Sequence, residues 1–113
     1  MLAFEYLYGE RVPQNYKQAA YWYKMAASQD DTSSIVNLAE MYQAGQGVHQ
    51  SYKIAYALFN LSISNGGSAK LRELIAEKMS RQEIAEGQEL TERLLQPKMF
   101  STALDAATRN SKK

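Results

Sequence analysis

The chain repeats itself with a period of 36 residues, and this repetition constrains the fold more than any other feature of the sequence. When residues 2–28 are aligned with residues 38–64, ten of the 27 residue pairs are identical. The identical pairs are Leu2/Leu38, Ala3/Ala39, Tyr6/Tyr42, Gly9/Gly45, Val12/Val48, Gln14/Gln50, Tyr16/Tyr52, Lys17/Lys53, Ala19/Ala55 and Ser28/Ser64. Such a period is typical of arrays in which each unit packs against the next, because one unit cannot bury its apolar face alone.

The first part of each unit predicts an α-helix. In the second copy Ile35, Leu38, Ala39 and Tyr42 lie at i, i+3, i+4 and i+7, which places them on one helix face. Gly45 follows, and glycine can adopt the positive φ of a helix C-terminus without a Cβ clash. We therefore expect this helix to end at Gly45.

A second helix is predicted after Asn15 and after Ser51, two N-cap residues that lie 36 positions apart. It carries two apolar stripes in each copy, and the remaining face is polar apart from Tyr21 and Ala57. In the first copy the stripes are Tyr16, Ala19, Ala20, Tyr23 and Ala27, then Gln18, Trp22 and Met25. In the second copy they are Tyr52, Ala55, Tyr56 and Phe59, then Ile54, Leu58 and Leu61. A helix covered on two sides belongs inside a stack.

The repeat fades after Gly67, but helical patterning continues. One helix is expected to bury Leu71, Leu74 and Ile75, and the capping box from Ser80 to Glu83 opens another. Many charged residues lie on this last pair, so we interpret it as a polar cap of the array.

The sequence therefore predicts an all-α chain, an α/α superhelix (solenoid) of antiparallel helical pairs. The expected units are a first repeat at 1–30, a second at 31–67 and a capping pair at 68–96. The tail, 97–113, is expected to hold at most a short helix and to fray.

Two segments resemble the Sel-one-like repeat, a relative of the tetratricopeptide repeat. Residues 38–48, LAEMYQAGQGV, are similar to the family pattern L-G-x-x-Y-x-x-G-x-G-V. Residues 17–27, KQAAYWYKMAA, resemble K-A-x-x-W-[FY]-x-K-A-A with displaced lysines. Arg11 departs from the pattern, because it replaces the second glycine of the first loop.

The resemblance implies a binding scaffold, often a bacterial adaptor, with no catalytic centre of its own. We expect a protein or peptide partner to contact the first helix of each unit outside its apolar stripe. The candidate residues are Glu5, Tyr8, Asn37, Glu40, Met41 and Ala44. Tyr8 and Tyr21 break the repeat, and they are either partner contacts or ordinary surface aromatics.

A structural assembly element that pairs with itself is the alternative function. Phe4 and Leu7 occupy positions where the second unit has Glu40 and Gln43. Exposed apolar ends of repeat arrays receive another repeat or pair with a neighbouring chain. These two residues therefore predict a homodimer, or a place in a longer array.

Catalysis and cofactors are not indicated. Cysteine-rich relatives in the resembled family are linked to β-lactam chemistry, but this chain has no cysteine and no Ser-x-x-Lys pair. A small hydrolase with a site between repeats would lack a nucleophile and a base. His49 is the sole histidine, too few for a metal site, and Glu83, Glu86, Glu89 and Glu92 drift around their helix.

Composition limits partners and location. The net charge of +1 offers no basic surface for nucleic acid, and the longest apolar run has six residues, too short to cross a membrane. The first residues do not form a signal peptide. We therefore expect no cofactor, metal, nucleic acid or membrane insertion, and a cytoplasmic location unless an upstream signal has been removed.

Overall fold

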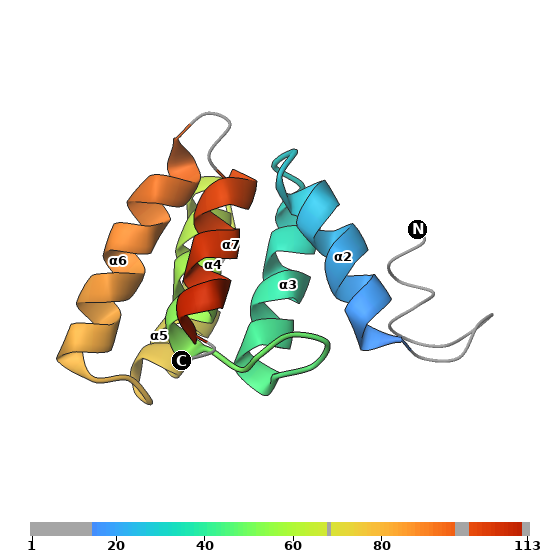
Figure 1. The fold of residues 1–113 in the computed structure, drawn as a ribbon. Coiled ribbons are helices and arrows are strands. Elements are labelled where there is room, and N and C mark those ends of the chain that lie inside the picture. Colours follow the sequence, from blue (N-terminus) through green and yellow to red (C-terminus); the bar gives the residue numbers. More distant parts are fainter. Residues whose placement is uncertain (1–14, 68, 97–99, 112–113) are drawn as a thin grey trace.

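The computed structural model describes residues 15–67, 69–96 and 100–111 of the chain. Within these ranges every regular element is an α-helix, and neighbouring helices run in alternating directions (Figure 1). The helices are α2 (Tyr16–Ala27), α3 (Thr32–Ala44), α4 (Tyr52–Ser64), α5 (Lys70–Ala76), α6 (Arg81–Leu95) and α7 (Phe100–Ser111). The all-helical prediction is confirmed.

The two predicted N-caps start α2 and α4. The side chain of Asn15 accepts a hydrogen bond of 3.1 Å from the amide of Gln18. Ser51 accepts one of 3.2 Å from the amide of Ile54. Each bond satisfies an amide that has no partner inside its own helix. The repeated spacing of Asn15 and Ser51 thus sets the same start for both helices.

Two further helix ends also follow the sequence. Gly45 ends α3 with φ of 73°, and its amide donates to the carbonyl of Met41 at 2.8 Å. Ser80 and Glu83 form both hydrogen bonds of the capping box at the start of α6. These local interactions explain why short stretches of sequence are sufficient to place the ends of α3 and α6.

The core is centred on α4, which packs against α3 on one side and α6 on another. Buried residues lie around most of its circumference: Ile54, Ala55, Tyr56, Ala57, Leu58, Phe59, Leu61 and Ser62. The two apolar stripes predicted for this helix are confirmed. Ala57 was placed on the polar face, and that prediction is wrong because α6 covers it.

The capping pair packs less deeply than expected. Ile75 is fully buried on α5, but Leu71 and Leu74 are 36% and 48% exposed. The expectation that all three are inside is therefore wrong. α5 has only seven residues, so it turns a single narrow face toward α4.

The tail differs most from the prediction. Residues Phe100–Ser111 form α7, a helix of 12 residues that packs against α6 and α4 (Figure 1). Phe100, Ala103, Leu104 and Ala107, spaced at i, i+3, i+4 and i+7, are buried. This part of the tail is helical and contributes to the core, in contrast to the expected tail with at most a short helix.

α7 also reaches the first two helices of the described chain. The Tyr42 hydroxyl on α3 shares a hydrogen bond of 3.0 Å with the hydroxyl of Thr108. Lys24 on α2 forms an ion pair with Asp105. The last helix thus links α2 and α3 to the capping pair.

The loop after α3 contacts the start of α2. Gly47 has φ of 76°, and a Cβ atom placed there would lie 2.2 Å from the carbonyl oxygen of Tyr16. This distance is far below van der Waals contact. Only glycine lets the loop of the second repeat approach the first helix of the described chain so closely.

We predict that Leu104→Ala lowers the free energy of unfolding by about 2–5 kcal/mol, because it opens a cavity under α7. Leu104 is fully buried. Leu74→Ala, at a half-exposed leucine on α5, is the control and should cost far less. Urea denaturation measures both, and equal losses would show that α7 is not part of the core.

Comparing the stability lost by Gly47→Ala with that lost by Gly66→Ala separates the effect of backbone strain from that of steric contact. Both glycines have positive φ, but a Cβ at Gly66 meets nothing within 4 Å. We expect Gly66→Ala to cost about 1–2 kcal/mol from strain alone. Gly47→Ala should cost about 1–3 kcal/mol more because the loop must move away from α2. Equal melting temperatures would contradict the close approach.

Candidate partner-binding surface

One stripe of α3 faces solvent. It contains Ser33, Asn37, Glu40 and Ala44, spaced at i, i+4, i+7 and i+11 along one side of the helix. Glu40, Ala44 and Ser33 are exposed, and Asn37 is half-buried. We call these four residues the α3 stripe. Three of the sequence-predicted partner-binding residues therefore share one accessible surface.

Met41 does not belong to this surface. It is 2% exposed, so its assignment as a partner-binding residue is wrong for this arrangement. Position 41 is 100° around the helix from position 40 and lies one turn from Leu38, on the buried side. α3 contacts both α2 and α4, and its buried face is consequently wider than the single stripe inferred from the sequence.

The remaining predicted site residues lie outside the described residues. They are Glu5 and Tyr8, proposed to contact a partner, and Phe4 and Leu7, proposed for self-association. These four assignments stay predictions.

A second accessible surface lies on α2. Tyr21 is 55% exposed, as expected for the polar face. Met25 is 43% exposed and Trp22 is half-buried, although both were expected on a buried stripe. The rings of Tyr21 and Trp22 meet edge to face, with centroids 5.4 Å apart. α2 thus presents more apolar surface than the sequence pattern indicated.

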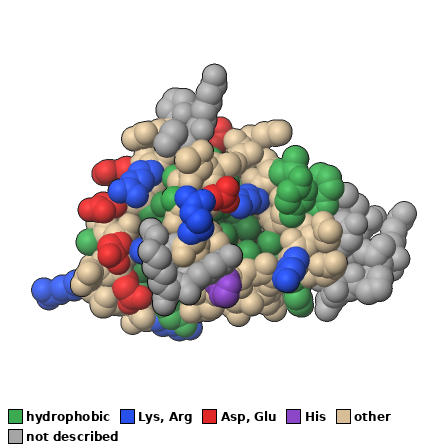
Figure 2. Space-filling model, viewed as in Figure 1, with side chains coloured by type: hydrophobic (Ala, Val, Ile, Leu, Met, Phe, Trp, Pro, Cys, Tyr) green, Lys and Arg blue, Asp and Glu red, His purple; other side chains and the backbone are tan. Residues whose placement is uncertain are grey.

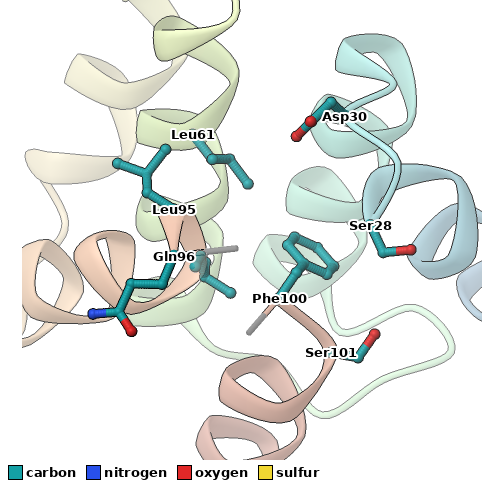
Figure 3. Close-up of a pocket in the computed structure, with 8 residues that line it drawn as sticks. Ser28, Asp30, Leu61, Leu95, Gln96, Phe100 and Ser101 are labelled. Atoms are coloured by element: carbon teal, nitrogen blue, oxygen red, sulfur yellow. The ribbon is translucent and has the colours of Figure 1, made fainter. Parts of the chain in front are cut away.

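A pocket of about 350 Å³ lies where the C-terminal ends of α2, α4 and α6 meet the start of α7. Figure 3 shows Leu61 and Phe100 pointing into it, with the Asp30 carboxylate at its rim. Its described lining consists of Ser28, Asp30, Leu61, Leu94, Leu95, Gln96, Phe100 and Ser101.

The phenol of Tyr42 has a perturbed pKa. Burial raises the pKa of the Tyr42 phenol above its ordinary value of 10.0, while the hydrogen bond to Thr108 and the charge of Lys24 act in the opposite direction. The hydroxyl of this tyrosine joins α3 to α7 through a hydrogen bond, and its side chain is almost fully buried. Its role is structural, because no substrate could reach the hydroxyl.

Acidic and histidine side chains do not converge in the part of the chain that the structure describes. No group of three or more His, Cys, Asp or Glu residues there could hold a metal ion. Glu83 is engaged in the capping box, and Glu86, Glu89 and Glu92 are exposed. His49 is exposed in the loop before α4, as expected.

Among the described residues, none of the helices combines the length and apolar character needed to span a membrane.

Comparison with models of protein families identifies the family of this chain. The family model described as Sel1 repeat matches residues 1–31 and 32–67, more than half of the chain. The chain belongs to the Sel1 repeat family. Sel1 repeats form helical arrays that generally mediate contacts between proteins and are generally not enzymes. The resemblance inferred from residues 17–27 and 38–48 is confirmed.

A solved structure supports the same fold for this Sel1 repeat chain. The crystal structure of c5321, a protective antigen present in uropathogenic Escherichia coli strains and displaying an SLR fold, superposes with a TM-score of 0.82 at 24% identity. The match covers 96% of this chain and 24% of c5321, so the chain spans about a quarter of that protein's length. A search of curated proteins found no match.

Sequence reasoning missed the pocket and the exposed face of α2. The pocket joins Leu61 to Phe100, which no local pattern connects. The exposure of Met25 depends on which helices lie over α2, although Tyr21 beside it in the helix did indicate an accessible face.

We predict a specific pH dependence for Tyr42. Above about pH 10 the unfolded chain loses the phenol proton before the folded chain does, so the free energy of unfolding falls as the pH rises. Tyr42→Phe should cost about 0.5–1.5 kcal/mol at pH 7 and make this alkaline fall shallower.

Thr108→Val is the matched control for Tyr42→Phe. It removes the same hydrogen bond but keeps the buried phenol, so it should lower stability at pH 7 without flattening the alkaline fall. Denaturation at pH 7, 9, 10 and 11 gives the free energy of unfolding of each variant and its dependence on pH. Identical pH dependence for the two variants would contradict the buried phenol.

Proposed function

We propose that this Sel1 repeat chain is a non-catalytic scaffold that binds a protein or peptide partner on the α3 stripe. The observation that carries the proposal is the division of α3 into two sides. One side is buried against α2 and α4, and the other presents Ser33, Asn37, Glu40 and Ala44 to solvent. Because these four side chains do not build the core, their arrangement is available for recognition.

The chemistry of the α3 stripe favours a peptide with hydrogen-bonding groups. Asn37 offers both a donor and an acceptor, and Glu40 offers a carboxylate one turn away. The small side chains of Ser33 and Ala44 at the two ends allow a partner's backbone to come close. A carboxylate at the centre favours a partner that places a Lys or Arg there.

Paired substitutions test this surface. We expect Glu40→Lys with Ala44→Glu to weaken partner binding at least about tenfold, or about 1.4 kcal/mol, because it reverses the charge and adds bulk on the stripe. The control is Ala85→Glu with Glu86→Lys, which makes the same two changes at exposed positions of α6.

The measurement has two stages. Quantitative mass spectrometry first compares proteins captured from the native host by the wild type and the two variants. Isothermal titration with the purified candidate then gives the dissociation constants. A partner lost equally from both variants, or from neither, would refute the α3 stripe as its binding site.

A further inference from the structure

α2 has a largely apolar face that is only partly used by the described core, because Trp22 packs against the core while its neighbours stay exposed. Gln18, Tyr21, Trp22 and Met25 are spaced at i, i+3, i+4 and i+7, and we call them the α2 face. Tyr21 and Met25 are 55% and 43% exposed. Figure 2 shows hydrophobic side chains gathered over α2 on the side turned to the viewer. Burial of large apolar side chains is favourable, so a partner that covers this face would be stabilised on it.

The second repeat shows what covers this face. Thirty-six residues after the α2 face lie Ile54, Ala57, Leu58 and Leu61 of α4, which are 0–3% exposed. α6 lies over Ala57, where the Thr91 hydroxyl approaches the Ala57 carbonyl. α7 also contacts α4, and its residues line one pocket with Leu61 and another with Lys53. The same repeat surface is therefore helix-covered in one copy and open in the other.

α7, which packs on both α4 and α6, has a simple pattern. Phe100, Ala103, Leu104 and Ala107 form its buried stripe, and Asp105 flanks them. Asp105 pairs with Lys24, so the edge of α2 already contacts this helix. The α2 face thus continues an interface that exists within the chain.

The charged residues of α2 indicate which kind of partner fits the α2 face. α2 contains no acidic residue, and its basic residues are Lys17 and Lys24. Lys24 is paired with Asp105, whereas Lys17 is exposed at the other end of the helix. If a second copy of α2 packed on this face, two basic helices would meet and neither would supply an acidic residue to offset the repulsion. An acidic occupant is favoured instead.

We propose that the α2 face docks an amphipathic helix of a partner protein, one with an apolar stripe at i, i+3, i+4 and i+7 and an acidic residue that pairs with Lys17. This mode of binding lays the apolar side of a helix on an apolar surface. It involves a different helix from the α3 stripe and goes beyond the function proposed above.

The probe is a peptide with the sequence of residues 100–111, FSTALDAATRNS, cross-linked between positions 102 and 106 to hold it helical. The cross-link is needed because helices of about 12 residues are marginal in water. Trp22 is the sole tryptophan of the chain, and the peptide has none. Tryptophan fluorescence of the full chain therefore reports binding at the α2 face directly.

We expect a saturable change in Trp22 fluorescence, which Met25→Glu weakens at least about tenfold. The matched control is Leu74→Glu, at a similarly exposed residue of α5, which should leave the affinity unchanged. Lys17→Glu should also weaken binding, and a peptide with lysine in place of its aspartate should restore it. Far-ultraviolet circular dichroism verifies that each variant is folded.

Three results would overturn the proposal. They are no saturation up to about 1 mM peptide, equal affinity for Met25→Glu and the wild type, and a homodimer in sedimentation that Met25→Glu disperses, which would assign the face to a second copy. The variant with Glu40→Lys and Ala44→Glu should bind the peptide normally, so failure here is distinguishable from failure of the α3 stripe.

Discussion

The arrangement of the described chain depends on the close contact between α4 and α6. α4 is buried around most of its surface, so its neighbours must approach it on several sides at once. Gly87 makes this possible on α6, because a Cβ there would lie 2.7 Å from the ring of Tyr56. Once α4 and α6 are packed at this spacing, α7 has a surface formed by both, and the pocket at its first residue follows.

Local interactions could be predicted from the sequence, and interactions between distant segments could not. Asn15, Ser51 and the Ser80–Glu83 capping box act within one turn of helix, and their residue types reveal them directly. The 36-residue period likewise fixed the repeat. By contrast, the Ser, Thr and Asn residues of α7 predict a fraying tail, because its apolar stripe from Phe100 to Ala107 meets a complementary surface only in the folded chain.

The candidate surfaces show the same limit: local patterns can be predicted from the sequence, but packing between distant segments cannot. Periodicity placed Glu40 and Ala44 on the accessible side of α3, but it could not show that two helices pack on α3 and bury Met41. It also predicted buried positions for Leu74 and Met25, because each lies on an apolar stripe of its own helix. Their exposure reflects neighbours that differ between units: α5 is short, and among the described residues no helix covers the outer face of α2 as α6 and α7 cover α4.

The two contacts from α7 to the beginning of the described chain affect how the protein folds. In an ideal repeat array each unit touches only adjacent units, so ends can unravel independently. Here Lys24 meets Asp105 across 81 positions, and Tyr42 meets Thr108 across 66. Such long loop closures raise the contact order and slow folding. They also couple the two ends of the described chain, because separating α2 and α3 from α7 breaks both contacts. During synthesis neither contact can form until residues 105 and 108 have left the ribosome.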